Sequence, residues 1–181
     1  ARDPAIDDDF ELREILLHSE RWAGKTDAAI MSFCRHVDKG YGPAWRGLVF
    51  RQQYPDLEDI INKTRVLFRK VYGERAKFTR SPNPVWRWPD GEELMLRCFD
   101  TVSDYDSYHG WSVPFQFWDE LTNWSTPDGF RKMRSIMKST HKEIRDLCFR
   151  VSTSNPSGPG RGWVMEMFDP ISGRVISDSR D

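Results

Sequence analysis

Residues 14–30 read EILLHSERWAGKTDAAI, an apolar segment, then a polar loop, then a segment with helical periodicity. Within it, Ser19-Glu20-Arg21-Trp22-Ala23-Gly24-Lys25-Thr26 has the spacing G-x-x-x-x-G-K-[ST] of a phosphate-binding loop, with Ser19 in the place of the first glycine. In such a loop the lysine reaches the β and γ phosphates of a nucleotide, and the hydroxyl residue ligands Mg²⁺. We therefore expect Lys25 to bind phosphate and Thr26 to bind the metal. The alternative is a chance Gly-Lys-Thr tripeptide, with Lys25 exposed at an ordinary helix start.

Strand and helix patterns alternate along the rest of the chain. We expect strands at 14–18, 47–50, 85–88, 93–99, 113–118 and 147–153, and helices at 25–36, 55–73 and 128–146. In the second helix one stripe is expected to be buried, formed by Leu57, Ile60, Ile61, Thr64, Leu67, Phe68 and Val71. Pro89-Asp90-Gly91 predicts a tight turn between two strands. The alternation indicates an α/β fold with a mostly parallel sheet.

Length and composition restrict the possible classes of protein. The 181 residues fit one domain, and we expect residues 1–13, which are acidic, to be a disordered arm. With 27 basic and 28 acidic residues, the chain has no bulk charge that would draw it to nucleic acid or to a membrane. Residues 131–150 hold seven basic and two acidic residues, which favours a solvated helix face over a DNA contact. The longest apolar run, 28–31, predicts no transmembrane helix and no signal peptide. Cys34, Cys98 and Cys148 are expected to be reduced core thiols.

Two later segments place polar side chains at strand ends. Asp119 and Glu120 follow the apolar strand 115–118, so Asp119 could hold Mg²⁺ while Glu120 polarises a water molecule. Taken alone, this pair is more often a solvated turn. Ser152, Thr153, Ser154 and Asn155 end another strand, where open α/β sheets bind ligands, although a plain turn explains them equally well.

Together with further blocks, these segments resemble the large terminase subunit of tailed bacteriophages, the motor that packages viral DNA. Residues 19–26 are similar to that family's variant phosphate-binding loop, in which arginine is frequent at the third place. The other matching blocks are Arg51-Gln52-Gln53 with Leu57, Tyr108-His109-Gly110, residues 115–122, and residues 153–160 with Trp163-Val164. The likeness covers residues 15–174, and the ordered combination is more specific than any single block.

The resemblance implies a fold, an activity and partners. The fold is a P-loop NTPase of the catalytic-glutamate type, with a mostly parallel central sheet flanked by helices and a β-hairpin insertion. The activity is Mg²⁺-dependent ATP hydrolysis that drives DNA translocation into a procapsid. The implied partners are double-stranded DNA, other copies in a ring, the portal and the small terminase subunit, in the host cytoplasm and with no membrane.

The resemblance also implies roles for single residues. Residues 19–26 bind ATP, with Lys25 on the phosphates and Arg21 stabilising charge in cis. Thr26 and Asp119 hold Mg²⁺, and Glu120 is the base that activates water. Ser152, Thr153, Ser154 and Asn155 couple hydrolysis to movement.

Some positions depart from the family pattern. Ser19 replaces a glycine, and His109 stands where some relatives carry an arginine that acts on a neighbour's ATP. No spaced cluster of acids predicts the nuclease domain of the full family protein, so we expect an ATPase fragment without nuclease activity. The alternatives are a helicase-type DNA-dependent ATPase and a nucleotide-binding module without turnover. Retention of Glu120 favours hydrolysis over binding alone.

Overall fold

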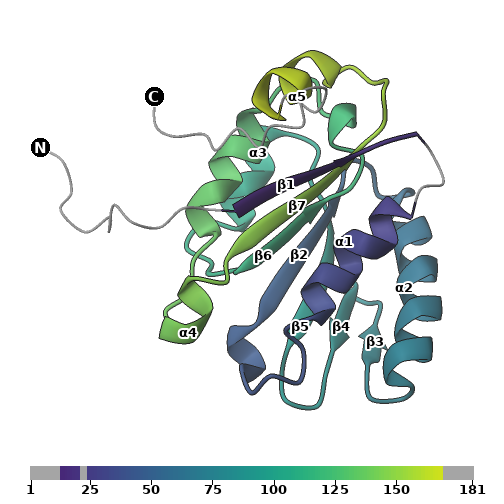
Figure 1. Ribbon diagram of the computed structural model, residues 1–181, viewed down its shortest axis with the longest axis vertical. Helices are drawn as coiled ribbons and strands as arrows, with labels where there is room; N and C mark the ends of the chain where they lie inside the picture. The colour runs from purple at the N-terminus through teal and green to yellow at the C-terminus, as the bar shows by residue number, and fades with distance from the viewer. Residues whose placement is uncertain (1–12, 21–23, 169–181) are drawn as a thin grey trace, which may run out of the picture.

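The computed structural model describes residues 13–20 and 24–168, which form a seven-stranded sheet with helices on both faces (Figure 1). The sheet order is β1-β7-β6-β2-β5-β4-β3. The strands are β1 (Arg13–His18), β2 (Arg46–Arg51), β3 (Lys77–Thr79), β4 (Val85–Arg87), β5 (Glu93–Cys98), β6 (Phe115–Trp118) and β7 (Phe149–Ser154). β1, β7, β6, β2 and β5 pair in parallel, while β4 pairs antiparallel to both β5 and β3. The expected α/β architecture is confirmed, including the β4–β5 hairpin, whereas the sequence did not predict β3.

The N-terminal prediction falls largely on residues that the structure does not describe. Residues 1–12 of the expected arm lie outside the described part of the chain. Arg13 is not part of an arm, because it pairs with Phe149 as the first residue of β1.

Helices cover the sheet in two layers. α1 (Lys25–Cys34) and α2 (Leu57–Tyr72) pack on one face, and α3 (Asp128–Lys132) and α5 (Arg161–Phe168) pack on the other (Figure 1). Short elements connect them: η1 (Gly42–Ala44), η2 (Val102–Ser107), η3 (Leu121–Asn123), η4 (Met133–Ile136) and α4 (Lys142–Arg145).

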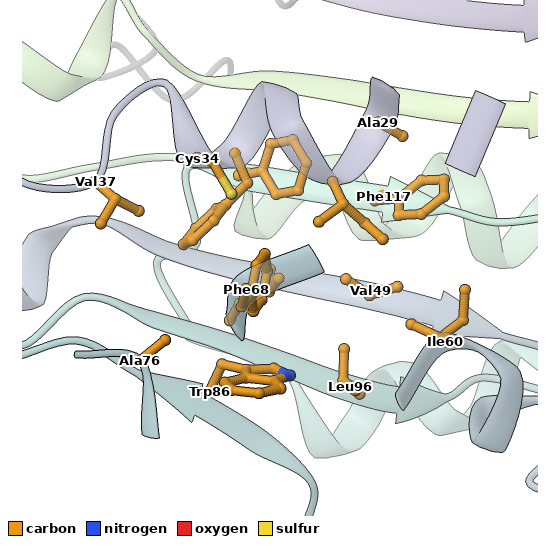
Figure 2. Packing of buried hydrophobic residues seen from close by; sticks show 14 of the residues in the cluster. Ala29, Cys34, Val37, Val49, Ile60, Phe68, Ala76, Trp86, Leu96 and Phe117 are labelled. Atoms are coloured by element: carbon orange, nitrogen blue, oxygen red, sulfur yellow. The ribbon is translucent and has the colours of Figure 1, made fainter. Parts of the chain in front are cut away.

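The core divides into two clusters because successive strand residues point to opposite faces of the sheet. Val49 and Phe117 belong to the cluster under α1 and α2 (Figure 2), whereas Phe50 and Trp118 belong to the cluster under α3 and α5. All four side chains are fully buried. A sheet covered on both faces explains why its strands read as nearly continuous apolar runs.

The apolar stripe of α2 lies almost entirely where its spacing predicts. Leu57, Ile60, Ile61, Thr64 and Phe68 are buried against the sheet, and Gly73 follows the helix with φ +60°. Val71 is an exception and the prediction for it is wrong, since it is 47% exposed in the last turn.

The predicted basic helix at 128–146 is not continuous. α3 ends at Lys132, η4 follows, and α4 begins only at Lys142. Between them Ser139 Oγ accepts the backbone N–H of His141 at 3.1 Å, a bond that competes with helical hydrogen bonding. The prediction rested on basic composition rather than on apolar periodicity, and composition alone does not hold a helix together.

Gln116 lies in the middle of β6 and is fully buried. Its amide donates to the Met133 carbonyl at 2.9 Å and accepts from Trp118 Nε1 at 3.1 Å. A polar residue is therefore tolerated in a buried strand because both ends of its amide are hydrogen-bonded.

The three cysteines are free thiols. Cys34 and Cys148 are buried, as expected, whereas Cys98 is only partly buried. Burial raises the pKa of Cys34 and of Cys98 to about 11, and that of Cys148 to about 12. Within the described ranges, no helix is long and apolar enough to span a bilayer.

Candidate active site

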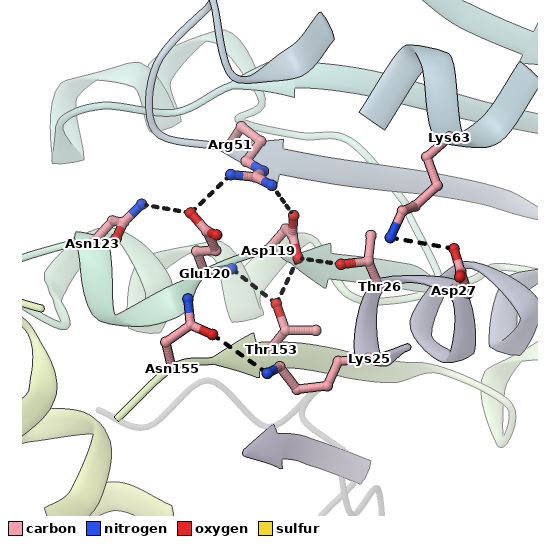
Figure 3. A network of polar contacts seen from close by, with 10 residues as sticks. All are labelled: Lys25, Thr26, Asp27, Arg51, Lys63, Asp119, Glu120, Asn123, Thr153 and Asn155. Carbon is pink, nitrogen blue, oxygen red and sulfur yellow. Dashed lines mark hydrogen bonds and ion pairs between the residues drawn. The ribbon is translucent and has the colours of Figure 1, made fainter. Parts of the chain in front are cut away.

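The polar residues predicted from the sequence meet where the parallel strands end. The register places His18 at the end of β1 opposite Ser154 on β7, and Trp118 at the end of β6 opposite Ser152. The residues that follow these strand ends therefore share one edge of the sheet with the start of α1 (Figure 3). The network drawn there contains Lys25, Thr26, Asp119, Glu120, Thr153 and Asn155 from the predicted set.

The predicted phosphate-binding loop, residues 19–26, is described at its two ends. Gly24 precedes α1 in the left-handed conformation, φ +71°, which glycine adopts without steric cost. Arg21, Trp22 and Ala23 lie outside the described residues, so the predicted role of Arg21 stays a prediction.

Lys25 folds back over this loop. Its ammonium donates to the carbonyls of Ser19 at 2.6 Å and Glu20 at 2.7 Å, and to Ser19 Oγ at 3.1 Å. It also donates to Asn155 Oδ1 at 3.4 Å, which links the loop to the end of β7. Burial lowers the pKa of Lys25, and the nearby carboxylates of Asp119 and Glu120 oppose that shift.

Ser19 keeps negative φ, because Asp38 and Glu120 are the described non-glycine residues with positive φ. Its replacement of glycine therefore brings no left-handed strain, and its hydroxyl instead accepts a hydrogen bond from Lys25. The departure from the glycine pattern is compatible with the loop geometry around the lysine.

Asp119 is the buried centre of the network. Its Oδ1 accepts hydrogen bonds from Thr26 Oγ1 at 3.2 Å and Thr153 Oγ1 at 2.6 Å, and its Oδ2 pairs with Arg51 Nη2 at 2.6 Å. The side chain is 1% exposed. Burial raises the pKa of Asp119, while Arg51 and Thr153 favour the ionised form and partly offset burial.

Glu120 directly follows Asp119 but adopts the left-handed conformation, with φ +57° and ψ +53°. Adjacent residues of an extended strand point to opposite faces, so this turn brings both carboxylates to one side. Glu120 Oε2 pairs with Arg51 Nη1 at 2.9 Å and accepts from Asn123 Nδ2 at 3.2 Å. Its backbone N–H donates to Thr153 Oγ1 at 2.9 Å.

The four residues predicted to couple hydrolysis to movement are placed differently. Thr153 bridges Asp119 and Glu120, and Asn155 contacts Lys25. Ser154 Oγ hydrogen-bonds His18 Nδ1 at 2.8 Å, beside the phosphate-binding loop. Ser152 is fully buried, and its hydroxyl has no hydrogen-bond partner among the described residues.

Sequence reasoning assigned no role to Arg51, although its segment matched a block of the resemblance. The structure places its guanidinium across both acids of the site, with a side chain only 10% exposed. An arginine at the end of an apolar strand is the signal that could have found it. The contact itself depends on β2 lying beside β6, which strand order along the chain does not reveal.

The donor set fits a nucleotide with Mg²⁺. A threonine hydroxyl and an aspartate carboxylate offer the oxygen ligands that Mg²⁺ prefers, next to a lysine and a helix start suited to phosphate. Thr26 and Asp119 are already in contact, so both can face one metal.

Comparisons with known proteins were made for both sequence and structure. No family model matches the sequence, and no curated protein matches it. Solved structures do match. The large terminase of a thermophilic bacteriophage aligns over 92% of this chain and 39% of its own, with 15% identity and a TM-score of 0.61. The large terminase of bacteriophage HK97 aligns over 92% of this chain and 34% of its own, with 14% identity and a TM-score of 0.60.

The large terminase ATPase domain of Thermus phage P74-26 aligns over 86% of this chain and 63% of its own, with 14% identity and a TM-score of 0.54. The chain thus spans less than two thirds of each of these proteins. Another structure of the first terminase was solved in complex with ADP. At these identities the likeness concerns the fold: the chain has the P-loop NTPase fold of phage large terminase ATPase domains.

Proposed function

We propose that the chain is the ATPase domain of a phage large terminase and that it hydrolyses ATP with Mg²⁺ to move viral DNA. The observation that carries the proposal is the set of contacts at the ends of β6 and β7. Thr153 and Thr26 both donate to Asp119, and Thr153 also accepts the backbone N–H of Glu120, while Lys25 contacts Asn155 beside them. These contacts gather at one sheet edge the side chains that we propose to bind phosphate (Lys25), hold the metal (Thr26 and Asp119) and act as the base (Glu120). The ADP complex of a terminase with the same fold supports nucleotide binding by a domain of this kind.

Each side chain has a distinct task in this reaction. Lys25 exchanges the carbonyls of Ser19 and Glu20 for phosphate oxygens, because an ammonium group prefers the more negative acceptor. Thr26 and Asp119 would hold Mg²⁺, which neutralises charge on the phosphates when it is bound. Glu120 accepts a proton from the attacking water, and Asn123 and Arg51 hold its carboxylate in place.

Charge that develops on the transferred phosphoryl group needs a further cation. We propose Arg21 for this role in cis, on the basis of its place in the loop. Residues 152–155 are proposed to pass the state of the site to the rest of the motor, with Thr153 and Asn155 as the direct contacts.

The partners belong to the same proposal. If the chain is a terminase ATPase domain, it acts on double-stranded DNA, in a ring with other copies, together with a portal and a small terminase subunit. The reaction would then take place in the host cytoplasm during viral assembly. These partners rest on the likeness of fold and on the sequence blocks, and each can be tested by binding.

Steady-state phosphate release by the purified chain tests the proposed activity. We expect Mg²⁺-dependent ATP hydrolysis that Lys25→Ala abolishes, together with nucleotide binding, because no other described cation replaces its contacts in the loop. Lys39→Ala is the matched control, since Lys39 is an exposed lysine beyond the end of α1. ATP affinity unchanged in Lys25→Ala by calorimetry would refute the assignment of the loop.

The same preparation separates the alternatives. A binding module would bind ATP in the wild-type chain without releasing phosphate. A helicase-type enzyme would separate a forked duplex in the presence of ATP, whereas a packaging motor domain is expected to leave the strands paired.

A further inference from the structure

Three carboxylates meet at the end of the sheet opposite the candidate active site. Asp38 follows α1, and Asp90 and Glu92 lie in the connection between β4 and β5. One oxygen of each lies within 4.8 Å of the others. β2 and β5 begin near this cluster, whereas Asp119 follows the far end of β6 (Figure 1).

Glu92 is the buried member of the cluster. Its side chain is fully buried, and its Oε1 accepts the backbone N–H of Asp38 at 3.1 Å. Its Oε2 is also buried and has no hydrogen-bond partner among the described residues. A buried carboxylate oxygen without a donor is unfavourable, and a cation beside it removes that penalty.

The described residues provide little positive charge to balance the cluster. Arg75 Nη2 pairs with Asp38 Oδ1 at 2.6 Å, and the Arg75 side chain is 56% exposed. The pKa of Arg75 is raised chiefly by its hydrogen bond to Asp38, and Asp90 and Glu92 add to the negative field. One exposed guanidinium therefore faces three carboxylates.

The segment just after Asp38 packs closely against the β4–β5 connection, which restricts how far the carboxylates can separate. A Cβ at Gly42 would lie 2.9 Å from the Asp90 carbonyl oxygen, and one at Gly91 would lie 2.8 Å from Pro43 Cγ. Within the connection, the backbone N–H of Trp88 donates to the Glu92 carbonyl at 3.1 Å. Repulsion among the acids must then be relieved by a bound ion or a proton.

Ligand type and spacing indicate the ion. Carboxylate oxygens suit hard cations, and Ca²⁺ binds them at about 2.3–2.6 Å while Mg²⁺ requires about 2.0–2.1 Å. Oxygens bound to one Ca²⁺ can thus be up to roughly 4.6–5.2 Å apart, and three oxygens that lie within 4.8 Å of one another can share a Ca²⁺ without moving closer together. Asp38 and Asp90 are exposed, which leaves room for water to complete the coordination.

We propose that Asp38, Asp90 and Glu92 form a divalent-cation site, with Ca²⁺ as the preferred ion, that ties the end of α1 to the β4–β5 connection. The site is structural and separate from the metal ligands at Thr26 and Asp119. It can therefore be loaded without nucleotide.

Calcium binding to the full, nucleotide-free chain tests the proposal after removal of metals with a chelator. We expect one Ca²⁺ per chain by calorimetry and a rise in melting temperature with Ca²⁺ concentration. Tb³⁺ luminescence provides a second probe, because the buried Trp88 lies two residues before Asp90 and can sensitise the bound ion. Ca²⁺ should displace Tb³⁺ at lower concentration than Mg²⁺, and the signal should persist in Thr26→Ala.

Two variants locate the ion. Asp90→Asn changes an exposed ligand and should weaken Ca²⁺ binding by about tenfold or more, because ligand charge sets affinity. Glu92→Gln should abolish the calcium-dependent rise in melting temperature, while Asp106→Asn, an exposed acid on η2, should leave binding unchanged. Equal Ca²⁺ affinity in Asp90→Asn and the wild-type chain, or no binding at millimolar Ca²⁺, would overturn the site. A Glu92→Gln chain as stable as the wild type in saturating Ca²⁺ would also overturn it, because the carboxylate would then contribute nothing through a bound ion.

Discussion

At the scale of single residues, Arg51 is the cation on which both acids of the candidate site depend. It contacts Asp119 at 2.6 Å and Glu120 at 2.9 Å. Removing one partner of a buried ion pair leaves an uncompensated charge, which costs about 3–5 kcal/mol. The cost belongs mainly to Asp119, because the Glu120 side chain is 34% exposed.

We therefore predict that Arg51→Met lowers the melting temperature in metal-free buffer by roughly 6–12 °C, taking about 3 kcal/mol and a chain of this size. Mg²⁺ should recover part of the loss, because it supplies positive charge at Asp119. Arg51→Lys is the control, because it keeps the positive charge but cannot contact both acids as the guanidinium does. Its melting temperature should fall by less than that of Arg51→Met. Thermal unfolding followed by circular dichroism, with and without Mg²⁺, measures the difference. An Arg51→Met chain as stable as the wild type without metal would contradict this role.

The two neighbouring acids have different proposed tasks and should respond differently to substitution. Glu120→Gln keeps the shape of the side chain but removes the base, so turnover should fall by about 10²–10⁴-fold while Mg-ATP still binds. Asp119→Ala should instead weaken the dependence of nucleotide binding on Mg²⁺. Phosphate release and titration with a fluorescent nucleotide measure the two effects. Hydrolysis at the parental rate by Glu120→Gln would show that the base has been misassigned.

At the scale of elements, one hydroxyl of β7 links that strand to the two acids that follow its neighbour β6. Thr153 Oγ1 donates to Asp119 and accepts from the backbone N–H of Glu120. Any movement of β7 along β6 would therefore shift the proposed metal ligand and the proposed base together. This contact gives the proposed coupling between β7 and hydrolysis a physical basis.

Thr153→Val is predicted to destabilise the chain by about 1–3 kcal/mol and to lower kcat more than it changes KM, because a buried donor and acceptor lose their partner. Thr153→Ser should keep most of the stability and most of the kcat of the wild-type chain, since serine retains the hydroxyl. Ser152→Ala is the matched control at the next position on β7, where the hydroxyl has no hydrogen-bond partner among the described residues. Urea unfolding and steady-state kinetics give the two readouts. If Thr153→Val and Ser152→Ala have the same stability and the same kcat, the hydrogen bonds of Thr153 to Asp119 and Glu120 do not contribute to either.

At the scale of the whole molecule, we predict that the isolated chain hydrolyses ATP slowly and that neighbours raise its rate. A well-placed arginine contributes about 10³–10⁵ in rate, and Arg21 is the candidate offered in cis. His109, in the position where some relatives carry arginine, packs its ring edge-on against Tyr105 and is a weak substitute. Turnover per chain should therefore rise with protein concentration and with double-stranded DNA.

Steady-state rates over a range of protein concentrations, with and without DNA, measure this dependence. Turnover of tens per second that is independent of concentration would contradict the need for neighbours. A plasmid nicking assay in Mg²⁺ or Mn²⁺ runs beside it, and we expect no nicking that exceeds a Lys25→Ala control.

Sequence predicted the parts of the molecule that depend on local pattern. The strand, loop and helix at residues 14–34 and the stripe of α2 follow from periodicity. Asp119 and Thr153 were expected at strand ends, and parallel pairing brings such ends together. The role of Arg51 needed the lateral order of the strands, which local pattern does not contain. The left-handed Glu120 could not be predicted because glutamate has no preference for that conformation.

The raised pKa values of the three native thiols have a practical consequence for labelling the protein. Maleimide dyes react with the thiolate, so thiols with pKa values of about 11–12 are poor targets at neutral pH. A cysteine introduced by Val66→Cys, at a position 74% exposed on α2, would have an ordinary pKa of about 8.5. At neutral pH its thiolate fraction would be roughly 300–3,000 times that of the native cysteines. A single dye can thus be attached without first replacing the native cysteines, which opens the chain to single-molecule fluorescence.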